Sequence, residues 1–134
     1  MNNEPDQPRP PKVQLVDNWS DQWSEAVAML DELAQRDVLR LDDEGWLPAR
    51  QNLLVAFNGA RAVGYLCFRV QPVIEDGAVR PDPAGRPLME AVVDGEGTLH
   101  NDRAAARQLR ESAMHRALEL RCARFRWERA VATV

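Results

Sequence analysis

The residues best suited to chemistry stand at the start of an alanine-rich helix in the C-terminal half of the chain. Asn101 and Asp102 are residue types that cap helices, and arginines follow at 103 and 107. The first turn of a helix has unpaired N–H groups and carries about half a positive charge. This segment therefore predicts a site for an anion such as a phosphate. The alternative is a well-capped helix start that binds nothing.

Other chemistries have little support in the sequence. The two cysteines, Cys67 and Cys122, lie apart in apolar segments, with no Cys-x-x-Cys or Cys/His cluster, so neither a zinc nor a redox site is indicated. His100 and His115 stand alone. The only lysine is Lys12. Two isolated thiols fit a reducing compartment, and we expect a cytoplasmic protein.

Charge is distributed unevenly along the 134 residues. The formal net charge is -4, with a pI near 5.2, which argues against a nucleic-acid-binding protein. Residues 1–60 have a net charge of -6, and residues 61–134 have a net charge of +2. A phosphorylated ligand suits the second part better, although a solvated charged helix face explains the same pattern.

Hydrophobic periodicity predicts a single domain over residues 13–134, after a disordered, proline-rich tail at 1–12. We expect a strand at Val13–Val16, a helix at Asp21–Gln35 and a short helix or lid at 42–50. Two strands, Leu53–Phe57 and Ala60–Val70, flank an Asn58-Gly59 hairpin turn. Residues 71–87, which contain four prolines, read as a loop or a frayed strand extension. Together with a strand, a helix and a final strand in the C-terminal half, these segments give the order β-α-(α)-β-β-β-α-β.

The C-terminal half predicts a β-α-β unit. Leu88–Asp94 reads as a strand that Gly95 and Gly97 break, and residues 103–121 place apolar side chains on one face of a helix. Ala123–Trp127 alternates apolar and charged residues, as a half-covered strand does. A crossover of this kind places its two strands side by side and parallel. The fold class is therefore α/β, with a mixed sheet.

This order of elements resembles the acetyl-coenzyme A-binding core of the GNAT (GCN5-related) N-acetyltransferases. The stretch from Ala113 to Glu128 is similar to the family's A-x-x-x-A-x-x-x-G-x-x-x-Φ-x-Φ-x pattern, where Φ is apolar. Counting back from it places the family signature, Q/R-x-x-G-x-G/A, at residues 101–106. Ala106 meets the last position, whereas Asn101 and Ala104 depart from the pattern.

The resemblance implies roles for particular residues. Coenzyme A would place its pyrophosphate on the backbone of Arg103, Ala104, Ala105, Ala106 and Arg107. Its pantetheine arm would lie along the backbone of Val92 and Val93. Glu90, eleven residues before Asn101, would be the base that deprotonates an amine substrate. Its apolar neighbours predict burial and a raised pKa. The alternative is a Glu on an exposed sheet face, paired with an arginine.

The resemblance also implies what this chain lacks. Many family members use a tyrosine on a helix after the fifth strand as the general acid, but the sequence ends at Val134 and its only tyrosine is Tyr65. We expect the family's C-terminal helix and last strands to be missing. Two functions stay open: an acyltransferase, or a degenerate non-catalytic domain for assembly or regulation. An exposed final strand predicts a homodimer. No run of apolar residues reaches the length of a membrane helix.

Overall fold

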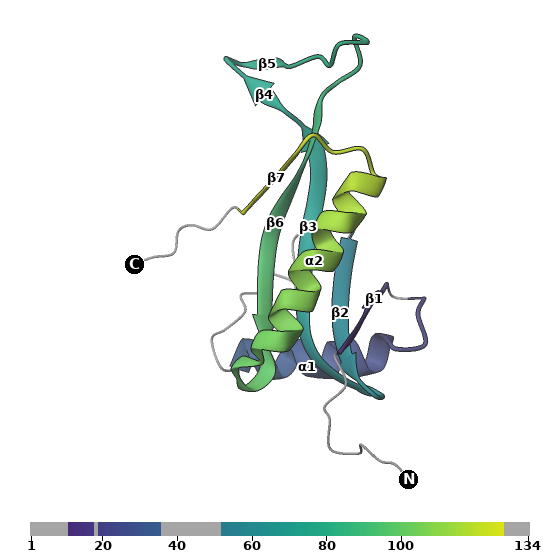
Figure 1. Cartoon of the computed structure of the whole chain (residues 1–134). Coiled ribbons are helices and arrows are strands. Elements are labelled where there is room, and N and C mark those ends of the chain that lie inside the picture. Colours follow the sequence, from purple (N-terminus) through teal and green to yellow (C-terminus); the bar gives the residue numbers. More distant parts are fainter. Residues whose placement is uncertain (1–10, 18, 36–51, 128–134) are drawn as a thin grey trace.

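The computed structural model describes residues 11–17, 19–35 and 52–127. Its main elements are a five-stranded sheet with one helix on each face (Figure 1). The helices are α1 (Trp23–Gln35) and α2 (Arg103–Glu119). The sheet contains β1 (Lys12–Leu15), β2 (Asn52–Asn58), β3 (Arg61–Pro72), β6 (Met89–Thr98) and β7 (Arg124–Trp127).

The strand order is β1-β2-β3-β6-β7, and only the last pair is parallel. Helix α2 follows β6 and precedes β7 along the chain, and it packs on one face of the sheet. The predicted β-α-β unit and mixed sheet are therefore confirmed. In this register Glu90 lies opposite Arg124, and Val93 lies opposite Trp127.

Two apolar clusters, one on each face of the sheet, hold the helices in place. Helix α1 buries Ala26, Met29, Leu30 and Leu33 against one face, which includes Tyr65 and Cys67. On the other face, α2 buries a stripe at spacings of four residues: Ala105, Leu109, Ala113 and Ala117. The small alanines allow α2 to approach closely the bulkier side chains of β3, such as Leu66 and Phe68.

Strand β6 is longer than the sequence predicts. It continues through Gly95 and Gly97 to Thr98, so the expected break at these glycines is wrong. The register shifts at Cys67/Phe68 of β3, which leaves Asp94 as the extra residue of a β-bulge. Bulges re-aim the side chains that follow them. The bulge therefore sets which way Glu96 and its neighbours face.

The β2–β3 hairpin turns one residue later than expected. Asn58 pairs with Arg61, so Gly59 and Ala60 form the turn in place of Asn58 and Gly59. Gly59 has a positive φ of 61°, which glycine adopts at little cost.

Gln71 and Pro72 continue β3, in agreement with the predicted strand extension, and residues 73–87 form an arm beyond it. Within it β4 (Ile74–Glu75) and β5 (Ala78–Val79) make a small hairpin that projects from the sheet (Figure 1). The predicted helix or lid at 42–50 lies outside the described residues, as do residues 1–10 of the predicted tail. Lys12, assigned to that tail, instead pairs with Phe57 as the first residue of β1.

Candidate active site

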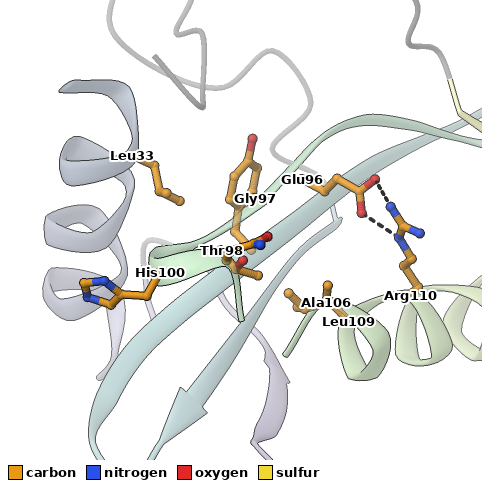
Figure 2. Close-up of a pocket in the computed structure, with 10 residues that line it drawn as sticks. Leu33, Glu96, Gly97, Thr98, His100, Ala106, Leu109 and Arg110 are labelled. Carbon is orange, nitrogen blue, oxygen red and sulfur yellow. Dashed lines mark hydrogen bonds and ion pairs between the residues drawn. The ribbon is translucent and has the colours of Figure 1, made fainter. Parts of the chain in front are cut away.

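The sheet opens into a pocket where β7 stops. Strand β7 pairs with β6 as far as Val93, so the stretch Glu96–Thr98 has β3 on one side and no described strand on the other. The pocket has a volume of about 510 Å³ and lies between α1 and the N-terminal half of α2 (Figure 2). Its walls are Leu33, Tyr65, Glu96, Gly97, Thr98, His100, Asn101, Ala106, Leu109 and Arg110.

The start of α2 forms one wall of this pocket. Asp102 is the N-cap, and its side chain accepts a hydrogen bond of 3.0 Å from the backbone N–H of Ala105. The backbone carbonyl of Asp102 accepts a hydrogen bond from the backbone N–H of Ala106, also at 3.0 Å. The N–H groups of Arg103 and Ala104 have no hydrogen-bond partner among the described residues. Two backbone donors at this helix start are therefore without a described partner, while the Asp102 carboxylate already accepts from a third.

The turn before α2 is held in an uncommon conformation. His100 and Asn101 both have positive φ angles, 57° and 53°, and both line the pocket. Residues other than glycine rarely adopt this region of backbone angles, and residues strained in this way are more frequent at functional sites. The hydroxyl of Thr98 supports the turn by accepting from the backbone N–H of Asp102 at 3.0 Å.

Glu96 ties three elements together at the mouth of the opening. Its carboxylate accepts two hydrogen bonds from Arg110 of α2, at 2.9 and 2.8 Å (Figure 2). It also accepts one from the indole N–H of Trp127 in β7, at 3.0 Å. The Arg110 guanidinium lies 5.5 Å from the centre of the Trp127 ring. A hydrogen bond to Glu96 is the main reason that the pKa of Arg110 is raised.

Glu90 lies elsewhere on β6 and does not line this pocket. It is 3% exposed, as burial by apolar neighbours predicts. The expected raised pKa is nevertheless wrong. Two hydrogen bonds from Arg126, at 3.2 and 3.1 Å, are the largest of the influences on the Glu90 carboxyl, and with one from Gln71 they lower its pKa despite burial. The arginine partner expected for a structural glutamate is therefore present.

The other predicted site residues fall into two groups. Val92 and Val93 are buried in β6, where β3 pairs with one side of the strand and β7 with the other. The β7 side of β6 is without a described neighbouring strand only beyond Asp94. In α2, Ala106 faces the pocket and Ala105 is buried in the core. The remaining residues of that segment, Arg103, Ala104 and Arg107, are exposed.

Sequence reasoning missed Glu96, Arg110 and Tyr65 as pocket residues. Glu96 stands between two glycines, and that spacing predicts a strand break. Arg110 follows Ala106 by four residues, so it shares that residue's side of the helix. This spacing could have identified Arg110. Tyr65 carries no comparable local signal.

The thiols and metal-binding residue types offer no further site among the described residues. Burial, with a smaller contribution from Asp94, raises the pKa of Cys67 to about 12. Burial also raises the pKa of Cys122. Both thiols are free and stay protonated at neutral pH. The described residues contain no cluster of three metal-ligating side chains, and neither described helix is long and apolar enough to cross a membrane.

Comparison with known proteins identifies the fold. No family model and no curated protein matches the sequence. Among solved structures, the chain is similar to a ribosomal-protein-alanine N-acetyltransferase from Brucella melitensis, with a TM-score of 0.60 and 19% identity over 89% of this chain and 79% of that one. It is similar to the aminoglycoside N-acetyltransferase AAC(6')-Iy in complex with CoA, with a TM-score of 0.59 and 13% identity over 92% and 82% of the two chains.

A GNAT family acetyltransferase from Staphylococcus aureus aligns over 94% of this chain and 95% of its own, with a TM-score of 0.58 and 10% identity. This chain has the GNAT fold. The alignments span almost all of the chain, which confirms the architecture that the order of elements predicted. At these identities the similarity concerns the GNAT backbone arrangement.

Proposed function

We propose that this protein binds an acyl-coenzyme A and transfers the acyl group to an amine. The observation that carries the proposal is the pocket at the end of β6, which joins an opened sheet edge to the first turn of α2 in a GNAT fold. The free N–H groups of Arg103 and Ala104 suit a pyrophosphate. The small side chain of Ala106 keeps the pocket wall open beside them. The relative that contains CoA supports the choice of ligand.

The reaction needs few groups from the protein. The lone pair of a neutral amine attacks the thioester carbonyl carbon, a C–N bond forms and the C–S bond breaks. The proton lost by the amine goes to a base, and the departing thiolate gains one. A base must lie within hydrogen-bond reach of the amine, directly or through one water. Glu96 lines the pocket, whereas Glu90 does not. We therefore propose Glu96 as the base and keep Glu90 as its rival.

A non-catalytic role is the second candidate. The specific observations in its favour are the cap carboxylate of Asp102 at the start of α2 and the pairing of both candidate bases with arginines, Glu90 with Arg126 and Glu96 with Arg110. A domain of this kind would bind coenzyme A without turnover, or bind nothing, and would act in assembly or regulation. The two free thiols support a reducing compartment such as the cytoplasm for either function.

A thermal shift assay with coenzyme A tests the proposal. Ligand at about 100 times its Kd stabilises a protein by roughly 2.7 kcal/mol, which raises the Tm of a domain of this size by several degrees. Asp102→Asn keeps a good N-cap but removes a negative charge next to the phosphates. Because charges near a helix N-terminus contribute about 0.3–1 kcal/mol, we expect coenzyme A to bind about two- to fivefold more tightly.

Asp31→Asn is the matched control, because it removes the same charge from a different helix. Asp31 is an exposed residue of α1 and is not part of the α2 N-terminus. This control should leave the affinity unchanged. An Asp102→Asn variant with wild-type affinity would place the phosphates away from α2. No Tm shift in the wild-type protein, at millimolar coenzyme A, would count against the proposed function itself.

We also propose a homodimer that includes β7. This strand pairs with β6 on one side only within the described residues, and edge strands tend to recruit another strand. Phe125 and Trp127 contact each other edge to face with ring centres 5.0 Å apart, and both stay partly exposed. Sedimentation velocity at micromolar concentration should give twice the chain mass. A monomer would indicate that Arg124 and Arg126 protect the edge.

A further inference from the structure

One wall of the pocket presents a tyrosine hydroxyl that makes no hydrogen bond to the described residues. Tyr65 lies on β3, opposite Gly97 of β6, and is 1% exposed. It lines the pocket, and its oxygen is not among the fully buried, unpaired side-chain atoms of the described residues, so the hydroxyl keeps a small accessible surface. A tyrosine hydroxyl can donate one hydrogen bond and accept another, and here both are open to water or to a ligand in the pocket. The wall of the pocket therefore offers a hydroxyl that has no partner within the described fold.

The backbone opposite makes room for this hydroxyl. A Cβ atom added at Gly95 would lie 2.9 Å from the Tyr65 oxygen, closer than a carbon atom approaches in a packed core. Gly95 follows the bulge residue Asp94, so the bulge and the glycine together place a bare stretch of β6 against the ring. Any side chain at 95 would push the hydroxyl out of its place.

The environment determines what the hydroxyl can do. Burial, followed by the charges of Cys67 and Glu96, raises the pKa of Tyr65 well above its usual range. Proton transfer from such a phenol to a coenzyme A thiolate would be uphill, since a thiol has an ordinary pKa of about 8.5. A neutral phenol can still donate a hydrogen bond without losing its proton. The matching ligand atom is an acceptor, such as a carbonyl oxygen.

We propose that the Tyr65 hydroxyl donates a hydrogen bond to the carbonyl oxygen of an acyl group held in this pocket. This proposal rests on the proposed acyl-coenzyme A binding. The proton stays on Tyr65 throughout. When the amine attacks, the carbonyl oxygen gains negative charge, and the same hydrogen bond becomes stronger. Tyr65 thereby distinguishes an acylated ligand from free coenzyme A, which has no such oxygen in that place.

Tyr65→Phe tests the proposal because it removes the oxygen and keeps the ring. Dissociation constants for acetyl-coenzyme A and coenzyme A are measured on both proteins by calorimetry. We expect the variant to bind acetyl-coenzyme A about three- to tenfold more weakly, as for a lost uncharged hydrogen bond, and coenzyme A equally well. The Tm without ligand should not fall, since the hydroxyl has no described partner to lose.

The chain provides an independent readout, since Tyr65 is its only tyrosine. With tyrosine labelled at the ring carbon that bears the hydroxyl, the protein should give one NMR signal, which moves on addition of acetyl-coenzyme A and much less with coenzyme A. Equal losses for both ligands, or a lower Tm in the variant, would show a structural role and overturn the proposal. Unchanged affinity for both would overturn it while leaving the proposed function standing. Wild-type protein that binds neither would overturn both.

Discussion

Glu96→Gln should lower kcat for acyl transfer by about 100-fold or more, within the range that general bases contribute. Glutamine keeps the size of the side chain, and its one carbonyl oxygen can still accept from Arg110 Nη2 and from Trp127, whereas the hydrogen bond from Arg110 Nε is lost. The glutamine cannot take a proton from the amine. KM for acetyl-coenzyme A should therefore change little, and the fall should appear in kcat. Steady-state kinetics with a panel of amines measures both.

Glu90→Gln is the informative companion to this variant. If Glu90 were the base, as the resemblance implies, its replacement would produce the loss of kcat and Glu96→Gln would not. Glu111→Gln, an exposed change on α2, controls for the loss of a charge. Normal turnover in both the Glu90 and the Glu96 variants would exclude either carboxylate as the base.

The architecture could be predicted from the sequence because its signals are local. Period-two alternation in Phe125 and Trp127, and the spacing of Leu109, Ala113 and Ala117 in α2, each arise within a few residues. Once these elements are placed, the rules for crossover connections leave few arrangements. The same reasoning placed Ala106 at the start of α2, where it lines the pocket, because a helix start is also a local feature.

The site itself depends on contacts between distant residues. Arg126, which lowers the pKa of Glu90, lies 36 positions away along the chain, and Gln71 lies 19 positions away. The apolar flanks of Glu90 predicted its burial correctly but carry no information about these partners. Gly95 shows the same limit. As a local signal it indicates a strand break, and only the approach of Tyr65 explains its place within β6.

Glu90→Gln should also lower the free energy of unfolding at neutral pH by about 1.5–3 kcal/mol, the usual contribution of a hydrogen bond to a charged group. The wild-type carboxylate, with its side chain 4% exposed, faces an arginine that is itself 46% exposed. Breaking the pair therefore leaves Arg126 in contact with water, which keeps the loss below that of a fully buried ion pair. Chemical denaturation measures the difference.

The pH dependence of this loss has a definite sign. Because the pKa of Glu90 is lower in the folded protein than in the unfolded chain, its contribution is fully present above the ordinary carboxyl pKa, near 4.3. It is lost as the pH falls through the lowered value. The stabilities of the wild type and Glu90→Gln should thus differ at pH 7 and converge in acid. Glu75→Gln is the control, since Glu75 pairs with Arg80 and Arg124 at the surface and its loss should change the Tm little. A difference between wild type and Glu90→Gln that persists in acid would mean that the glutamine distorts the sheet, and that the ion pair is not what stabilises this end of β6.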